Sequence, residues 1–407
     1  MQNKKLFILF LITALLINTS CKKDEDVVSF DNNWDEDVYV FGNNLKTRHK
    51  NLFHNISEAK FNEDIKLLRS KTNTLSDAEI NIELFKIINK ISDSHTSIMG
   101  GSWFTTLPFS VEWLSDGMII TGINEENSQY LGKKIVAICG IDIETIIDHF
   151  STLIAYENES CLRWFITSYL RVPEIYNHFG ISESENSITL NLEGGVNIEL
   201  FSMEEELVSI YTGVSLPLYM SNTSDYYWYS ALNNEEFLYI QYNRAKERND
   251  LSFQTFTTQI SELINQSNTI SKIIIDLRLN SGGNSLIAKP LIELLHYYVN
   301  HSILLPENIY VIIGRKTFSS AVLNSIELME AFNPIFIGEP SGGKPNHFGE
   351  VERFTLPNSK LRVSYSTKYF NWLQDDPSSI IPNTIIEVSS EDLLQGIDPV
   401  LDYILIQ

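Results

Sequence analysis

The feature that most constrains the fold is a set of short strands built from consecutive apolar residues in the second half of the chain. They read "KIIIDL" (272–277), "IYVII" (309–313) and "IFIG" (335–338). A strand that does not alternate apolar with polar residues is buried on both faces. Amphipathic stretches typical of helices separate these runs. The order therefore predicts an α/β domain in which helices cover both faces of a mostly parallel sheet.

Each of these strands runs into a loop of unusual composition: "RLNSGG", "RKTFSS" and "PSGGKPNHFGE". Ligands of such sheets bind at the carboxyl ends of the strands, so we place the candidate chemistry in these loops. Gly282 and Gly283 serve either a tight turn or the exposure of backbone N–H groups. Asp276 and Arg278, before that turn, are expected either to form an ion pair that steadies the loops or simply to lie on the surface.

Ser319 and Ser320 stand where the second strand passes into a helix, and they allow two interpretations. Serine is a preferred N-cap residue, so either of them could simply begin the helix. Alternatively, Ser319 is a nucleophile. In that case the N–H of Ser320 and an N–H of the Gly282–Gly283 turn would form an oxyanion hole.

The first half of the chain has a different character. Residues 34–100 show helical periodicity, and Ser76 with Glu79 predicts a capping box at the start of one helix. Residues 104–205 consist of short alternating runs typical of strands, including a hairpin around residues 194–195. These segments predict a helical region followed by a β-rich domain.

The amino terminus has the pattern of an export signal. Residues 1–20 combine a basic start with the apolar run "LFILFLITALLI", which is short for a membrane span. Small residues before Cys21 predict cleavage there and acylation of that cysteine, as in bacterial lipoproteins, with residues 21–33 as a polar tether. An ordinary secretory peptide or an uncleaved anchor is the alternative. We expect an envelope protein held at a membrane.

Charge and cysteine content exclude some classes of function. The chain has 30 Lys and Arg against 52 Asp and Glu, a net charge of −22, which disfavours nucleic acid as a partner. Cys139 and Cys161 allow one disulfide at most and lack metal-ligand spacing. We predict neither a metal nor another cofactor.

Four segments together resemble the C-terminal processing peptidase family, also called tail-specific proteases, which includes the tricorn protease core. They are "IIIDLRLNSGG", "TFSSA", "IGEPSGGKPNHFGE" and "SDSHT". The resemblance implies a crotonase-like catalytic core of repeated ββα units at 206–407 and an inserted PDZ-like domain at 104–205. It makes Ser319 the counterpart of the catalytic serine. Val322 stands where the family often has Glu.

The resemblance offers two general bases for Ser319. Lys344 matches the base of the bacterial processing branch, and His95, preceded by Ser94, matches the tricorn-like branch. We favour His95, with Ser94 supporting it; Lys344 would then be structural or bind a substrate carboxylate. Three acids are candidates for orienting His95: Asp375, Asp376 and Glu350.

The sequence therefore predicts a serine endopeptidase that cleaves envelope or extracellular polypeptides, whose C-terminal tail would dock on residues 104–205 or beside them. A catalytically inactive peptide-binding lipoprotein on the same scaffold is the alternative. A crotonase-type acyl transferase acting on coenzyme A esters is a third reading, which the export signal disfavours. The oligomeric state is not predicted.

Overall fold

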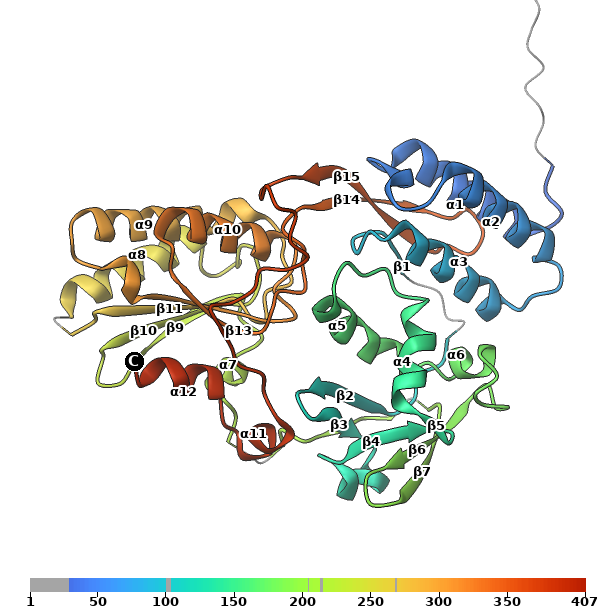
Figure 1. Cartoon of the computed structure of the whole chain (residues 1–407), viewed down its shortest axis with the longest axis horizontal. Coiled ribbons are helices and arrows are strands. Elements are labelled where there is room, and N and C mark those ends of the chain that lie inside the picture. Colours follow the sequence, from blue (N-terminus) through green and yellow to red (C-terminus); the bar gives the residue numbers. More distant parts are fainter. Residues whose placement is uncertain (1–28, 100–103, 204, 213–214, 268) are drawn as a thin grey trace, which may run out of the picture.

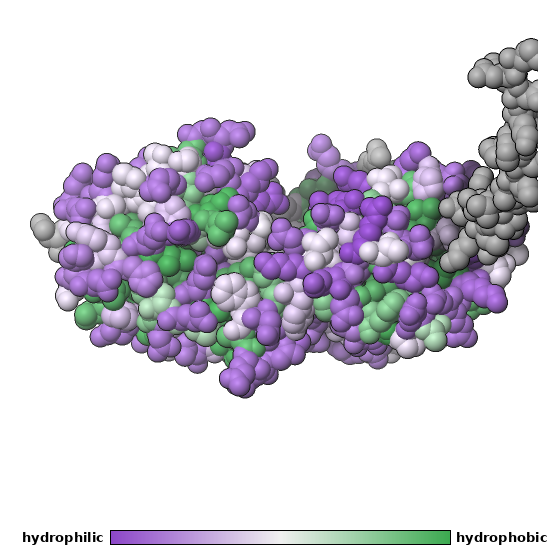
Figure 2. All heavy atoms as spheres, turned by 90° about the horizontal axis from the view of Figure 1, so that it is seen from above, coloured by the Kyte–Doolittle hydropathy of each residue, from purple (hydrophilic) through white to green (hydrophobic). Residues whose placement is uncertain are grey.

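The computed structural model describes residues 29–407 except 100–103, 204, 213–214 and 268. The predicted signal peptide and the predicted lipidation site at Cys21 lie outside this part. Among the described residues, no helix is long and apolar enough to cross a membrane. Hydrophilic residues cover most of the face seen in Figure 2, with smaller apolar groups among them.

Helices open the described chain. They are α1 (Asn33–Arg48), the 3-10 turn η1 (Leu52–His54), α2 (Glu58–Lys71) and α3 (Asp77–Ile91). Ser76 and Glu79 form the predicted capping box of α3. The apolar faces of α1, α2 and α3 share a core with residues from the far end of the chain, among them Phe354, Leu361 and Val363.

A long hairpin joins the two ends of the sequence. It consists of β14 (His347–Thr355) and β15 (Arg362–Phe370), and β15 also pairs antiparallel with β1 (Ser97–Met99). In Figure 1 the hairpin reaches from the α/β half of the molecule to the first helices. The sequence did not predict this pairing. It matters because β1 follows directly on the loop that carries Ser94 and His95.

Residues 109–209 hold an antiparallel sheet with helices. Its strands are β2 (Phe109–Leu114), β3 (Gly117–Ile123), β4 (Lys134–Ile138), β5 (Ile141–Asp142), β6 (Ser187–Leu192), β7 (Val196–Phe201) and β8 (Val208–Ser209). The other elements are η2 (Glu125–Tyr130), α4 (Ile143–Ser151), α5 (Glu159–Tyr169) and α6 (Pro173–His178). The hairpin predicted around residues 194–195 is present as β6–β7. Cys139 and Cys161 are both free, so the disulfide that the sequence allowed is not formed.

The α/β half contains a six-stranded sheet in the order β16-β13-β12-β11-β10-β9. Its strands are β9 (Tyr227–Leu232), β10 (Phe237–Tyr242), β11 (Lys272–Asp276), β12 (Ile309–Ile313), β13 (Ile335–Gly338) and β16 (Thr384–Ile385). All neighbours are parallel except β9 with β10.

Helices cover both faces of this sheet, as the consecutive apolar runs predicted. On one face lie α8 (Phe253–Gln266), α9 (Lys289–Asn300) and α10 (Ser320–Phe332), and on the other lies α12 (Pro399–Leu405) (Figure 1). The shorter elements are α7 (Leu218–Ser221), η3 (Ser285–Ala288), η4 (Pro306–Asn308) and α11 (Ser390–Gln395). The helical segment between β11 and β12 is divided near Pro290, with η3 before the proline and α9 beginning next to it, because proline is tolerated only in the first turn of a helix. The mixed α/β architecture is thus confirmed.

Candidate active site

Ser319 lies between β12 and α10 in an unusual backbone conformation. It occupies the N-cap position of α10 with φ 52° and ψ −122°, yet its side chain makes no capping hydrogen bond. A positive φ at a residue other than glycine costs of order 1–3 kcal/mol and persists only where the surrounding structure imposes it. Such strain is typical of functional positions, including nucleophiles held on a sharp strand-to-helix turn.

Four other serines in this chain show what a capping serine looks like. Each has an extended backbone, and its side chain accepts the N–H of the residue three positions on; they are Ser57, Ser76, Ser252 and Ser389. Ser319 differs from them in both respects. Within the described chain its hydroxyl has no hydrogen-bond partner. The hydroxyl is therefore free for chemistry, and the geometry does not support the cap interpretation.

The Gly282–Gly283 turn packs directly against Ser319. A Cβ on Gly282, whose φ is 105°, would lie 2.7 Å from Ser319 Cβ and 3.1 Å from Ser320 N. A Cβ on Gly283, whose φ is 137°, would lie 2.1 Å from the Ala245 carbonyl oxygen. Only glycine fits at either position, on steric grounds and on backbone grounds alike.

This turn leaves backbone donors beside the serine. The Gly282 N–H is occupied, because it donates to Asn280 Oδ1 at 2.9 Å. The N–H groups of Gly283 and Ser320 have no acceptor among the described residues. Unpaired N–H groups at a helix N-terminus suit an oxyanion. Of the predicted oxyanion-hole residues, Gly283 and Ser320 thus offer a donor, and Gly282 provides the close approach.

Substituting Gly283 with alanine is expected to lower the free energy of unfolding by about 3 kcal/mol or more, since the new Cβ meets backbone as well as a forbidden φ. Gly194 is the matched control: its φ is 86° and nothing lies within 4 Å of a Cβ there. Gly194→Ala should cost only about 1 kcal/mol, the backbone part alone. Chemical denaturation of both variants measures the difference, and equal losses would contradict the close approach at Gly283.

His95 lies beside the nucleophile segment, in the loop between α3 and β1. Its ring stacks on Phe318, the residue before Ser319, with centroids 4.6 Å apart and planes at 24°. Its side chain is 7% exposed. Neither ring nitrogen has a hydrogen-bond partner in the described chain, although both are shielded from solvent. An orphaned imidazole of this kind is expected where a substrate or a hydroxyl completes the bonding.

Burial lowers the pKa of His95 to about 4, with nearby His347 adding to the shift and Asp93 opposing it. The imidazole is therefore neutral at pH 7 and has a lone pair to accept a proton. That is the state a general base requires.

The carboxylate closest to His95 is one the sequence analysis did not select. Asp93 Oδ1 lies 4.0 Å from His95 Nδ1 and accepts the His95 backbone N–H at 2.9 Å. Asp93 Oδ2 accepts from His49 Nε2 at 2.9 Å and from Thr96 Oγ1 at 2.6 Å. Burial opposes ionisation, but the hydrogen bond from His49 and the neighbouring His95 lower the pKa of Asp93 to about 2. Asp93 is thus an ionised buried group beside the imidazole.

None of the three predicted orienting acids contacts His95. Asp375 and Glu350 are exposed, and Asp376 accepts from Lys344 Nζ at 2.9 Å. Lys344 follows Gly343, whose Cβ would lie 3.1 Å from Ser319 N, so its loop does touch the nucleophile segment. Its ammonium, however, is ion-paired with Asp376 and partly exposed. This arrangement suits a structural role for Lys344, since a base must be neutral to accept a proton.

Ser94 does not contact His95 through its hydroxyl, as its predicted supporting role requires. Its Oγ donates to Glu157 Oε2 at 2.5 Å. Burial raises the pKa of Glu157 to about 8, against the effects of the Ser94 hydrogen bond and of Lys344. Glu157 precedes α5 in the segment "AYENES", where nothing in the sequence distinguishes it from a surface acid. The structure therefore adds a second carboxyl group next to the candidate base.

A protonated Glu157 has a consequence for stability. Because its folded-state pKa lies above the unfolded value, the folded chain binds more protons between pH 4.5 and 8, so stability falls as pH rises through that range. Glu157→Gln keeps an acceptor for Ser94 and removes the titration. Relative to wild type, the free energy of unfolding of this variant should rise by about 4 kcal/mol between pH 5 and pH 9, as measured by urea unfolding. A constant difference between the two proteins would show that Glu157 is ionised throughout.

A column of four rings fixes the position of His95. Phe318 and His347 both stack on His95, and the His95 and His347 ring centroids are 5.2 Å apart with planes at 12°. Phe370 stacks on His347 at 5.2 Å and 28°. His347 and Phe370 belong to β14 and β15, the hairpin that pairs with β1. The unpredicted hairpin thus holds the candidate base against the nucleophile segment, and no sequence signal identified His347.

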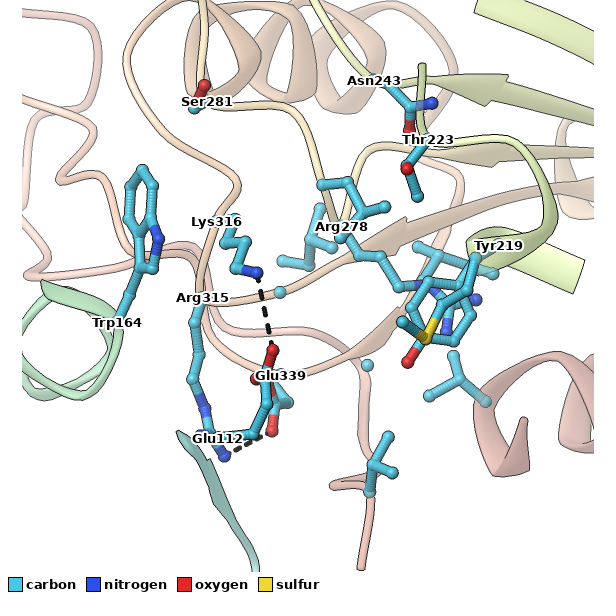
Figure 3. Close-up of a pocket in the computed structure, with 18 of the residues that line it drawn as sticks. Glu112, Trp164, Tyr219, Thr223, Asn243, Arg278, Ser281, Arg315, Lys316 and Glu339 are labelled. Atoms are coloured by element: carbon cyan, nitrogen blue, oxygen red, sulfur yellow. Dashed lines mark hydrogen bonds and ion pairs between the residues drawn. The ribbon is translucent and has the colours of Figure 1, made fainter. Parts of the chain in front are cut away.

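A cavity of about 800 Å³ adjoins this site, between β2, α5 and the carboxyl ends of β11, β12 and β13. Ser281, next to Gly282, lies at one border of it, and Trp164 of α5 lies at another (Figure 3). Arg278 lines it and pairs with Asp276 and Asp398, which extends the predicted ion pair. Ser319, His95 and the Gly282–Gly283 pair are not among the residues that line this cavity, so Ser281 is its link to the candidate active site.

Solved structures share the fold of this chain. Mature CPAF complexed with lactacystin matches with a TM-score of 0.61 at 12% identity, over 92% of this chain and 97% of that one. Mature CPAF alone gives 0.60 at 11% identity, over 91% and 95%. The photosystem II D1 C-terminal processing protease is a looser match, at 0.40 and 11% identity over 89% and 98%. No family model matches the sequence, and no curated protein does.

The match to CPAF spans nearly all of both chains, so the likeness holds for the whole arrangement and not for one domain. The chain is therefore similar to CPAF in fold. This confirms, at the level of fold, the family resemblance that the four sequence motifs predicted. The activity and the roles of single residues rest on the geometry described above.

Proposed function

We propose that this protein is a serine peptidase in which Ser319 is the nucleophile and His95 the general base. One observation carries the proposal. A strained serine with an unused hydroxyl lies next to a phenylalanine on which a neutral, unpartnered histidine is stacked. The free N–H groups of Gly283 and Ser320 supply the remaining requirement, donors for a developing oxyanion.

The reaction proceeds in two halves. Ser319 Oγ attacks the peptide carbonyl while His95 takes its proton, and the Gly283 and Ser320 N–H groups bind the oxyanion. Collapse breaks the C–N bond, and His95 returns the proton to the leaving amine. Water then attacks the acyl-enzyme with His95 again as base, which releases the acid and restores Ser319. Asp93 stabilises the transient imidazolium, since it is a buried carboxylate 4.0 Å from His95 Nδ1.

The finer architecture is part of the proposal. Parallel strand–helix units from β10 to β13 support a crotonase-like core, and the order strand, turn, short strand, helix at β4, β5 and α4 supports a PDZ-like insertion. An export signal with lipidation at Cys21 would place the enzyme in a bacterial envelope, acting on polypeptides there.

A peptide-binding protein without catalysis is the second candidate, because no hydrogen bond joins Ser319 to His95 in this structure. Catalytic hydrogen bonds often form only once substrate is bound, so a free enzyme and a binding protein can both lack the Ser319–His95 hydrogen bond. Incubating the chain from Lys22 onward with casein and a peptide mixture, followed by mass spectrometry, separates the two. New peptides that are absent with Ser319→Ala support the peptidase. Peptide binding with no cleavage supports the binding protein.

A further inference from the structure

The cations around the 800 Å³ cavity differ in one respect that points to its ligand. Most of them are neutralised: Arg163 and Arg315 both pair with Glu387, and Lys316 lies 3.8 Å from Glu112. Arg278 pairs with Asp276 and Asp398. Arg244 has no carboxylate partner within the described residues. Arg244 is exposed, and in a chain with net charge −22 it keeps its positive charge without a neutralising partner in the part that the structure describes.

Lys246 lies next to Arg244 and is also without a carboxylate partner in the described chain. The Arg244 guanidinium lies 5.7 Å and the Lys246 ammonium 5.4 Å from the centroid of the Tyr226 ring. The two side chains therefore lie on the same side of their loop, and the ring stabilises them there by a cation–π interaction. Together they form a positive site, which we call the Arg244–Lys246 site.

This site lies beside the turn that would bind the oxyanion. Ala245, between the two cations, pairs with Gly283, donating its N–H to the Gly282 carbonyl at 3.0 Å. Arg244 also lines a smaller cavity of about 400 Å³ that includes Gly282, Gly283 and Lys246. One acid, Glu247, lines it too, and its Oε2 already accepts from the Phe253 N–H and the Tyr227 hydroxyl. Ser281 and Asn243, the sequence neighbours of Gly282 and Arg244, both line the large cavity, and Figure 3 shows them in the upper part of the view, on separate segments. A polypeptide whose carbonyl oxygen binds the Gly283 N–H would therefore lie close to both cations.

We propose that the Arg244–Lys246 site binds the side-chain carboxylate of a substrate Asp or Glu, so that this enzyme selects polypeptides with an acidic residue close to the cleaved bond. The inference rests on the proposed peptidase function and adds its substrate class. The Ala245 segment pairs with Gly283, and neighbouring extended segments lie about 4.8 Å apart. Because an extended peptide advances about 3.4 Å per residue, the bound carboxylate lies within about three residues of the cleaved bond.

The test uses matched peptides in which one position at a time carries Glu or Gln. We expect wild type to cleave the Glu form about tenfold better in kcat/KM at the selected position, with a smaller preference at high salt. Arg244→Ala/Lys246→Ala should cleave both forms equally. Arg244→Glu should prefer Lys at that position. Lys71→Ala, an exposed cation on α2, should keep the wild-type preference. A preference that is absent from wild type, or unchanged in the double variant, overturns the proposal.

Binding to Ser319→Ala separates this proposal from the peptidase proposal. Trp113 and Trp164 line the cavity, so their fluorescence reports occupancy. Glu-dependent binding that disappears with Arg244→Ala/Lys246→Ala would support the carboxylate site even if wild type cleaved nothing. Cleavage by wild type without any charge dependence in cleavage or binding would overturn the carboxylate site and leave the peptidase intact.

Discussion

Ser319→Ala is expected to reduce peptide hydrolysis by about 10⁴-fold or more while leaving the fold intact, because the substitution removes the nucleophile and nothing that the fold needs. The structure explains why the fold should stay intact. Ser319 makes no capping hydrogen bond, so its hydroxyl contributes nothing to the start of α10. Steady-state cleavage of a casein-derived peptide and urea unfolding are the two measurements.

Stability distinguishes a nucleophile from a cap at the same position. Ser57→Ala and Ser252→Ala remove true caps and should each cost about 1 kcal/mol. Ser319→Gly should instead raise the free energy of unfolding by about 1 kcal/mol, since glycine adopts φ 52° without strain. An inactive variant that is more stable than wild type is the signature of strain retained for function. A loss of stability in Ser319→Gly would mean that the serine supports the helix after all.

The second large effect concerns the base. His95→Phe keeps a ring between Phe318 and His347 but removes the proton acceptor, and should lower kcat by 10²–10⁴-fold. Lys344→Met removes the ion pair with Asp376 and should change kcat by less than about tenfold. The two variants therefore separate the alternatives that the sequence left open.

The pH dependence of kcat/KM is an independent test of whether His95 or Lys344 is the general base. Because burial lowers the pKa of His95 to about 4, kcat/KM of wild type should stay level on lowering the pH until close to that value. A lysine base would make activity rise steeply towards alkaline pH. A full loss of activity in Lys344→Met with normal folding, together with an active His95→Phe, would reverse the assignment.

Much of the α/β half could be predicted from the sequence, for a physical reason. Buried parallel strands need uninterrupted apolar residues, so β11, β12 and β13 were visible as runs. The Gly282–Gly283 turn and Ser319 followed from their places at the ends of those strands. The same local logic identified the Ser76 capping box, since a cap is defined within four consecutive residues.

The residues that surround His95 could not be predicted from local sequence patterns, because they are brought together by contacts between distant parts of the chain. Asp93 is only two residues from His95, yet what marks it as the acid beside the candidate base is its hydrogen bonds with His49 and Thr96 in the folded chain. Glu157 has a raised pKa only because the folded chain buries it, against the effect of the hydrogen bond from Ser94. His347 reaches His95 through the pairing of β15 with β1, which no local pattern announces. Asp375, Asp376 and Glu350 were selected by order along the chain, and their side chains lie elsewhere.

The central claim is that Ser319 is activated by His95. Covalent labelling with a fluorophosphonate tests it most directly, because such reagents modify activated serine hydroxyls without requiring a known substrate. We predict a single adduct on the peptide that contains Ser319, formed by wild type and by Lys344→Met, and at least 10²-fold more slowly by His95→Phe. The absence of an adduct on Ser319 in the folded wild-type chain, or an equal rate in His95→Phe, would contradict the account.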